Sequence, residues 1–349
     1  TYGPLSWPGA VSGVVADDGP AGVARVEVSL LREATHYWNG AAWQAGAFWV
    51  AVEAVGGAWV LPLAAADLAG GTSYLVRCRA VDRAGNEQAQ PDEAGFTFDA
   101  EAPTGSFSIG AGQPAATGSR SVVLAMAVSG AAEMSFCNAG APWSDWETVA
   151  ATRDWQLLGG DGEKRVYGRF RDGVGNLLEV SDTILLDSVA PTAALVLAPT
   201  AGPQTWGGLL GGTASDNAGG SGVARVEVQC GRASDGAFWD GAGWVAGEVW
   251  LAAAGTAAWQ VPLPAAALTS GVRYGVAARA VDLAGNLQDP AAPASVLYDA
   301  GLPVSTIGMP GTVGLATWPG GILGTASDAV SGVARVEVRL RQVPGGTVS

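Results

Sequence analysis

Apolar and polar residues alternate over several short stretches of this chain, with a period of two. In the stretch 225–230, three apolar positions alternate with three polar ones: Val226, Val228 and Cys230 alternate with Arg225, Glu227 and Gln229. A second alternation covers residues 274–281, and a third stretch ends at Asp299. Because successive side chains of a strand point to opposite faces, this pattern predicts antiparallel strands that bury one face.

One of these strands is repeated. The heptapeptide Gly-Val-Ala-Arg-Val-Glu-Val occupies residues 22–28, 222–228 and 332–338. A seven-residue identity that recurs within one chain predicts an array of one structural unit. It also lowers the expectation of an enzyme, because a repeated unit usually serves length or valency.

The repeated unit is best seen in residues 206–299. There the heptapeptide strand is followed by a tryptophan-rich hairpin around Asp240-Gly241 and later by a tight turn, Asp282-Leu-Ala-Gly285-Asn286. About seven short strands in roughly 100 residues is the size of an immunoglobulin-like sandwich. Residues 1–99 repeat this unit almost position for position, whereas residues 103–187 keep the turn but lack the heptapeptide.

We therefore predict an all-β chain of tandem immunoglobulin-like β-sandwich domains arranged as an extended rod. The predicted domains are 1–100 (first strand missing), 101–188 (diverged), 189–300, and 301–349 (partial, first three strands). The linkers share one spacing, in which Asp99, Asp187 and Asp299 each precede a proline by four residues. Short linkers with proline favour a semi-rigid arrangement.

Composition narrows the function classes. The formal net charge is −14 with a single lysine, Lys164, so the positive surface that nucleic acid or anionic lipid requires is missing. The three cysteines stand at non-equivalent repeat positions, so no disulfide framework is predicted. No segment has the uninterrupted apolar length of a membrane helix, and we expect no membrane insertion in this segment.

Two motifs carry a resemblance to a known family. Leu68-Ala-Gly-Gly-Thr-Ser-Tyr74 and its counterpart ending at Tyr274 resemble the tyrosine corner of fibronectin type III and immunoglobulin-like sandwiches. The segments 79–86 and 279–286, with the linkers, resemble tandem bacterial immunoglobulin-like repeats of large secreted or cell-surface proteins. The resemblance covers essentially the whole chain. In the middle unit, however, Tyr167 falls out of register with Tyr74.

The resemblance implies a structural segment of an extracellular filament, stalk or adhesin shaft, located outside the cell or on its surface. Self-association or contact with neighbouring copies of the chain is the partnership expected of such a segment. Catalysis finds no support, because the only histidine, His36, has no nucleophile motif around it. We predict that the chain is not an enzyme.

Calcium is the one cofactor for which candidate ligands recur. One loop supplies Asp18, Asp216 and Asp328, the tight turn supplies Asp82, Asp172 and Asp282, and the linkers supply Asp99, Asp187 and Asp299. Calcium takes about six to eight oxygen ligands, many from carboxylates. The alternative is plain turn chemistry, since Asp and Asn side chains bond to nearby backbone amides.

Two further alternatives stay open. The hairpin tryptophans Trp38, Trp43, Trp239 and Trp244 would bind carbohydrate or a protein if exposed, whereas their recurrence favours packing within each unit. The first unit lacks a first strand, and residues 301–349 carry the first strands of another copy. Either the sequence is a window of a longer chain, or one molecule's tail completes the next molecule's head by strand addition.

Overall fold

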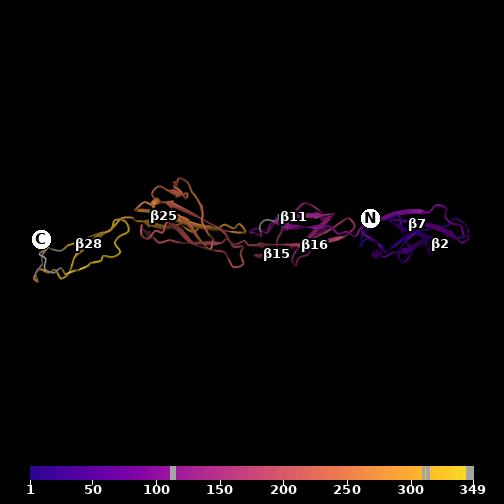
Figure 1. Cartoon of the computed structure of the whole chain (residues 1–349), viewed down its shortest axis with the longest axis horizontal. Coiled ribbons are helices and arrows are strands. Elements are labelled where there is room, and N and C mark those ends of the chain that lie inside the picture. Colours follow the sequence, from indigo (N-terminus) through magenta and orange to yellow (C-terminus); the bar gives the residue numbers. More distant parts are fainter. Residues whose placement is uncertain (111–114, 309–310, 312–314, 343–349) are drawn as a thin grey trace. The chain divides into compact units, whose positions relative to one another are not determined.

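The computed structural model describes residues 1–110, 115–308, 311 and 315–342. Its elements are short strands (Figure 1), and the described residues also form the single-turn 3-10 helices η1 (Ala65–Asp67) and η3 (Ala265–Ala267). Contacts divide the chain into two compact units. One contains residues 1–113, 120–159 and 163–184, and the other contains residues 114–119, 160–162 and 185–349. The four-domain boundaries predicted from the sequence are finer than this division and stay predictions.

The first sandwich lies in the first unit and packs a two-stranded sheet against a six-stranded one. The small sheet pairs β1 (Ala10–Val14) with β6 (Ala58–Pro62). The large sheet has the order β4-β3-β2-β7-β8, with β5 also paired to β2. Its strands are β2 (Val23–Arg32), β3 (His36–Trp38), β4 (Trp43–Ala45), β5 (Val50–Val52), β7 (Thr72–Asp82) and β8 (Asp92–Phe98).

The first sandwich is held by one core that draws on both sheets. Val26 and Val28 of β2 are buried, as the alternation of the heptapeptide predicts, and Trp59 and Leu61 of β6 face them. The tyrosine corner is confirmed, because the hydroxyl of Tyr74 accepts a hydrogen bond from the backbone N–H of Ala69 at 2.7 Å.

A second sandwich follows in the same unit. Its three-stranded sheet has the order β14-β11-β9, with β9 (Thr104–Ile109), β11 (Ser121–Ser129) and β14 (Thr152–Gln156). The facing sheet has the order β16-β15-β12-β13, with β12 (Glu133–Asn138), β13 (Glu147–Thr148), β15 (Gly162–Arg171) and β16 (Leu177–Leu186). A short strand, β10 (Ala116–Thr117), runs parallel to the end of β16.

The core of the second sandwich is built around Phe107, Phe136 and Phe170. The ring of Phe136 makes edge-to-face contacts with the other two rings. This sandwich has no tyrosine corner, since Tyr167 of β15 is 39% exposed and the ring does not enter the core. The sequence departure of the middle unit therefore corresponds to a different core.

The third sandwich, in the second unit, repeats the first with one strand more in the small sheet. That sheet has the order β17-β19-β24, with β17 (Thr192–Val196), β19 (Leu209–Ser215) and β24 (Ala258–Pro262). The larger sheet contains β18 (Thr200–Ala201), β20 (Val223–Arg232), β21 (Ala237–Trp239), β22 (Trp244–Val245), β23 (Leu251–Ala252), β25 (Val272–Asp282) and β26 (Ala294–Tyr298).

The third sandwich also has a tyrosine corner, in which the Tyr274 hydroxyl accepts the backbone N–H of Thr269 at 2.8 Å. All-β tandem immunoglobulin-like sandwiches are therefore confirmed as the fold.

Among the described residues after 300, β27 (Val304–Ile307) pairs with β28 (Gly324–Ser327). The third strand predicted here, at residues 332–338, is not formed in the described part of the chain. In β2 and β20 the same heptapeptide pairs with β7 and β25, and no such partner follows β28 among the described residues. Without the partner, Val336 and Val338 of this copy stay exposed.

Candidate functional site

The linker residue Asp187 is buried at the edge of the third sandwich. It directly follows β16, and its side chain is fully shielded from solvent. One carboxylate oxygen accepts the backbone N–H of Ser221 at 2.7 Å, and the other accepts that of Val189 at 3.3 Å. Burial raises the pKa of this carboxyl, but the bonds from Ser221 and Val189 outweigh it and hold the pKa below its ordinary value.

The tight turn at the end of β25 supplies the second carboxylate. Asp282 is buried, and its two oxygens accept the backbone N–H and the side-chain N–H of Asn286 at 2.8 and 2.7 Å. The turn needs Gly285, whose φ of +89° lies in the left-handed region. The amide of Asn286 also donates to the backbone carbonyl of Asp187 at 2.7 Å. One side chain thus ties the turn to the linker.

The loop after β19 supplies the third carboxylate, that of Asp216. Its oxygens accept the backbone N–H groups of Asn217 and Gly222 at 2.9 and 2.7 Å. Gly220 lets the loop close over it, because a Cβ there would lie 2.7 Å from an Asp216 oxygen. The loop is therefore shaped around this carboxylate.

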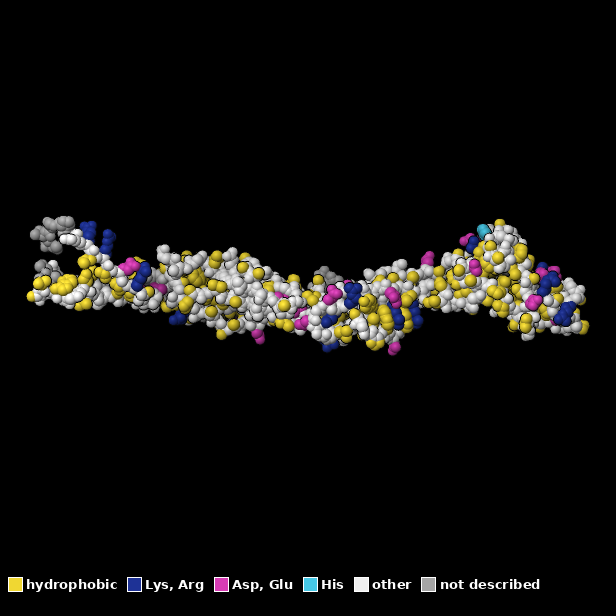
Figure 2. Space-filling view, turned by 90° about the horizontal axis from the view of Figure 1, so that it is seen from below, with side chains coloured by type: hydrophobic (Ala, Val, Ile, Leu, Met, Phe, Trp, Pro, Cys, Tyr) yellow, Lys and Arg dark blue, Asp and Glu magenta, His cyan; other side chains and the backbone are white. Residues whose placement is uncertain are grey.

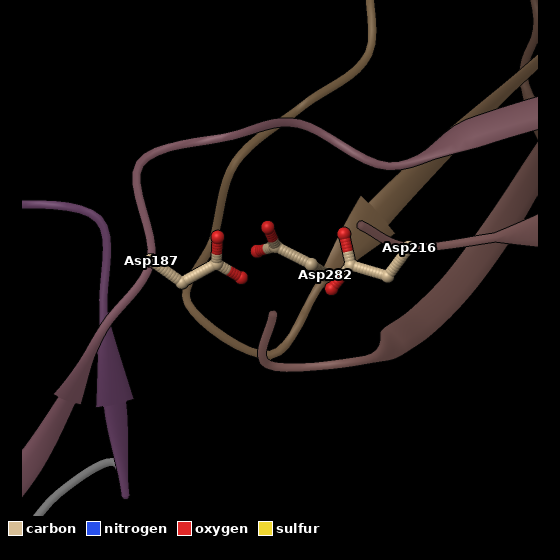
Figure 3. Close-up of side chains that lie close together, drawn as sticks. All are labelled: Asp187, Asp216 and Asp282. Atoms are coloured by element: carbon tan, nitrogen blue, oxygen red, sulfur yellow. The ribbon is translucent and has the colours of Figure 1, made fainter. Parts of the chain in front are cut away.

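Together these three segments form an acidic cluster. Each of Asp187, Asp216 and Asp282 places one carboxylate oxygen within 4.8 Å of the others, and Figure 3 shows the three side chains meeting from separate segments. In the described ranges no salt bridge from Arg or Lys reaches the cluster. Carboxylate oxygens that lie this close without a basic neighbour suit a hard divalent cation such as calcium.

The other predicted ligands are only partly assembled. At Asp99 the carbonyl accepts the Asn176 side chain at 3.1 Å, and Asn176 is bound to Asp172 at 2.8 Å. The residue that follows β11 is Gly130, where Asp216 follows β19, so this position offers no carboxylate. At Asp299 one oxygen accepts the Ser331 N–H at 3.0 Å, and Asp328 accepts the same N–H at 2.9 Å. The tight turn has no counterpart in residues 301–349.

In the first sandwich, Asp82 holds Asn86 through both of its oxygens, as Asp282 holds Asn286. Asp18 is exposed, and the structural counterpart of Asp216 is Asp17, because β1 residue Val14 pairs with Ala58 as Thr213 pairs with Ala258. The sequence offers a sign of this equivalence, because Trp7 and Trp206 are 199 residues apart, as are Asp17 and Asp216. Asp17 has one buried carboxylate oxygen without a hydrogen-bond partner in the described residues.

Sequence reasoning also passed over the groups that hold the linkers. Asn176 and Asn286 fix the linker carbonyls, and the residue before the heptapeptide, Ser221 or Ser331, donates its N–H to the linker carboxylate. The recurrence of Asp-x-x-Gly-Asn and of Ser-Gly-Val-Ala-Arg in the sequence was the available signal.

The hairpin tryptophans pack against the cores. Trp38 and Trp239 are 4% exposed, and each contacts the second tryptophan of its hairpin. The Trp43 and Trp244 rings each contact a tyrosine-corner ring and an arginine, Arg32 or Arg232. Their indole N–H groups donate to Asp67 and Ala267 carbonyls. These contacts favour the structural interpretation over carbohydrate stacking.

The remaining reactive side chains do not form a site with one another. The three cysteines are free thiols: Cys137 and Cys230 are buried, and Cys78 is partly buried. Burial raises the pKa of the Cys230 thiol to about 12, which suits a small buried hydrophobe. His36 bonds the hydroxyl of the adjacent Thr35 at 3.0 Å.

No family model matches the sequence, and no match was found among curated proteins. Similar solved structures include a Ca²⁺-stabilised adhesin that helps an Antarctic bacterium reach out and bind ice. It is 16% identical with a TM-score of 0.34, over 83% of this chain and 68% of that chain.

A second similar structure comes from a 1.5-MDa bacterial ice-binding adhesin, with 13% identity and a TM-score of 0.35 over 86% of this chain and 94% of that chain. A third consists of fibronectin(III)-like modules of Clostridium thermocellum CbhA, with 16% identity and a TM-score of 0.33 over 56% and 94% of the two chains. Similarity at this level does not transfer a function to this chain.

The surface adds two facts. On the face seen in Figure 2, acidic and basic side chains are interspersed, and no basic side chains gather into one large patch. Among the described residues, no helix has the length and apolar character needed to cross a membrane.

Proposed function

We propose that this chain is a load-bearing segment of an extracellular filament, stalk or adhesin shaft. The observation that carries the proposal is the repeated attachment of linker to sandwich. The carbonyl of Asp99 is bound by Asn176, and that of Asp187 is bound by Asn286. A linker bonded in this way resists bending where a free linker would not.

The carboxylates of the linkers add a second attachment. Asp187 and Asp299 each accept the N–H of the serine that precedes a heptapeptide. Hydrogen bonds to charged groups are stronger than those between neutral groups. Both the backbone and the side chain of one linker residue therefore hold the same sandwich, which supports a role in transmitting force along the chain.

Calcium is the cofactor that this arrangement fits. The three carboxylates of Asp187, Asp216 and Asp282 are oxygen donors from a linker, a loop and a strand end. Backbone N–H bonds already orient these carboxylates, so their side chains would lose little conformational freedom on binding a cation. A cation there would offset the mutual repulsion of three buried or half-buried negative charges and fasten the linker more tightly.

The surface character fits an exported structural segment. Acidic residues outnumber basic ones, 32 to 18, which keeps such a chain soluble and disfavours nucleic acid as a partner. The repeated sandwiches give the chain length, and the packed tryptophans stabilise the core of each sandwich. A non-enzymatic role outside the cell or on its surface is the function that these features support best.

Electron microscopy of native material tests this role. A shaft predicts long, thin particles or fibres on the cell surface with a period of one or a few sandwiches. Antibodies against the chain should label these particles outside the cell. Compact particles, or label confined to the cytoplasm, would contradict the proposal.

A further inference from the structure

The heptapeptide strands of the first and third sandwiches neutralise one arginine on the neighbouring strand. Glu27 lies opposite Arg79 in the pairing of β2 with β7, and its carboxylate binds the guanidinium at 2.6 Å. Glu227 lies opposite Arg279 in the same way, and the two side chains meet at 2.7 Å. Each arginine stands three residues before the aspartate of its tight turn. In both sandwiches, therefore, the charge at this position is balanced within the domain.

The second sandwich keeps the arginine and lacks the glutamate. Arg169 of β15 also stands three residues before the aspartate of its tight turn, and Ser135 of β12 lies opposite it. The Ser135 hydroxyl donates to the carbonyl of Ser144 at 2.8 Å. Phe170 packs in the core, so alternation places Arg169 on the outer face of the sheet. In the described residues Arg169 has no salt bridge, and its buried Nε has no hydrogen-bond partner.

The acidic side chains of the surrounding strands do not replace the missing partner. Glu133 and Glu147 each pair with a different arginine, at 2.6 and 2.7 Å. Glu179 of β16 is exposed. Burial raises the pKa of the Cys137 thiol, and the charges of Arg169 and Glu179 act on this thiol in opposite directions, so both lie near it. Glu179 is thus the carboxylate with which a ligand of Arg169 would compete.

Aromatic side chains accompany this guanidinium. The segment between β12 and β13 brings Trp143 and Trp146 to Arg169, whose guanidinium carbon lies 4.4 and 4.5 Å from the two ring centres. The first and third sandwiches each bring a single tryptophan to the corresponding arginine. Tyr167 lies two residues before Arg169 on β15, on the same face, and is 39% exposed. Both tryptophans and Arg169 are only partly buried, so a ligand can reach them.

This combination of groups fits a ligand with one carboxylate and an apolar face. A guanidinium binds a planar carboxylate through two parallel N–H bonds, and aromatic rings contact apolar surfaces. The net charge of −14 repels ligands that carry many negative charges. A pyranose that carries a single carboxylate, which is an acidic sugar, offers the anion and an apolar face without a high charge.

We propose that the outer face of the second sandwich binds an acidic sugar at Arg169. The guanidinium holds the carboxylate of the sugar, and the pyranose ring lies against Tyr167 and the edges of Trp143 and Trp146. One sandwich of the array thereby gains a recognition function, which goes beyond the structural role proposed above. The site contains none of the residues of the acidic cluster, so it does not depend on calcium.

Ligand-observed saturation-transfer NMR of the full chain at pH 7 tests the proposal, with glucuronic acid as the probe and glucose as its neutral counterpart. We expect glucuronic acid to bind and glucose to bind at least about tenfold more weakly, because only the former pairs with a charged group. Arg169→Gln should weaken glucuronic acid binding by at least about tenfold. Arg279→Gln is the matched control, because this arginine occupies the same position in the third sandwich and is held by Glu227.

Two further variants separate ligand binding from a merely structural role of Arg169. Glu179→Gln removes the competing carboxylate and should strengthen binding, an effect that damage to the fold would not produce. Ser135→Glu restores the partner found in the other sandwiches and should abolish binding. Because Ser135 is buried, the circular dichroism spectrum of this variant is recorded first, and Glu179→Gln decides the question if the fold is lost.

Several results would overturn the proposal. Absence of glucuronic acid binding is one, and equal binding of glucuronic acid and glucose, which would indicate a surface for neutral sugars, is another. Acetate that binds as tightly as glucuronic acid would reduce the site to one for simple anions. Binding that survives Arg169→Gln, or that is lost equally in Arg279→Gln, would place the sugar elsewhere on the chain.

Discussion

At the scale of single residues, one asparagine links the tight turn of the second sandwich, and one that of the third, to the linker before it. Asn286 donates its side-chain N–H groups to both Asp187 and Asp282, and Asn176 does the same for Asp99 and Asp172. Asn86 makes the bond within its turn, to Asp82, with no described linker carbonyl in reach of it.

Replacing Asn286 with alanine should loosen the linker at Asp187. The loss of two hydrogen bonds, one of which leaves a part-buried carbonyl unpaired, should cost about 1–3 kcal/mol. Hydrogen exchange of residues 187–191 in the full chain should speed up accordingly. Asn86→Ala is the control: it should disturb its own turn and leave exchange at 187–191 unchanged. Equal effects of the two variants at that linker would contradict the role of Asn286.

The heptapeptide glutamates predict a dependence on pH. Burial raises the pKa of Glu227, but bonds from Arg225 and Arg279 outweigh it and hold the pKa below its ordinary value. A folded-state pKa below the unfolded one gives stabilisation that is complete above about pH 4.3 and is lost as pH falls through the folded-state pKa. Glu227→Gln should lower the free energy of unfolding at pH 7 by about 1–3 kcal/mol and flatten its acid dependence.

Glu337 is the control for Glu227, because it pairs with Arg335 while 74% exposed. Such a surface pair contributes about 0–1 kcal/mol, so Glu337→Gln should leave the chemical denaturation curve nearly unchanged. An equal loss of stability in both variants, or none in Glu227→Gln, would contradict the interpretation.

The sequence named each member of the acidic cluster as a candidate ligand but misaligned one loop, and the calcium site stays a prediction. The three residues that form the cluster, Asp187, Asp216 and Asp282, were all among the predicted ligands. The sequence places Asp18 in the same loop as Asp216, whereas strand pairing makes Asp17 its counterpart. Loops of different length hide such equivalences, and only the flanking strands reveal them.

At the scale of elements, the heptapeptide shows that pairing rather than local sequence makes a strand. Two identical copies form the inner strands β2 and β20, and the third, at 332–338, forms none in the described structure. Alternation predicted correctly which side would be buried, with Val226 and Val228 inside. It could not predict whether a partner strand would be present, because that is a property of residues about 50 positions away.

Gly212 should be indispensable to the pairing of β17 with β19. A Cβ at this position would overlap the Ala194 carbonyl and crowd the Trp59 counterpart, Trp259. Gly212→Ala should therefore cost about 1–3 kcal/mol and accelerate hydrogen exchange in residues 192–196. Gly207→Ala, where nothing lies within 4 Å, should change neither quantity. Unaltered exchange in Gly212→Ala would contradict the packing at this edge.

At the scale of the whole molecule, tandem β-sandwiches with bonded linkers suit a part that transmits force. The sequence predicted this fold because the repeats, the turns and the tyrosine corners are all local patterns. It did not predict how the linkers are fastened, since that depends on residues such as Asp187 and Asn286, 99 positions apart. It also left open whether the hairpin tryptophans are exposed, which only the tertiary packing decides.

Calorimetric melting of the full chain in millimolar calcium and in EDTA tests the central claim, that calcium fastens the linker at Asp187. At calcium concentrations about 100 times Kd, binding adds about 2.7 kcal/mol to the stability of the sandwich concerned. One unfolding transition should therefore move up by several degrees, and Asp216→Asn should abolish the shift. Identical melting in calcium and in EDTA would contradict the claim.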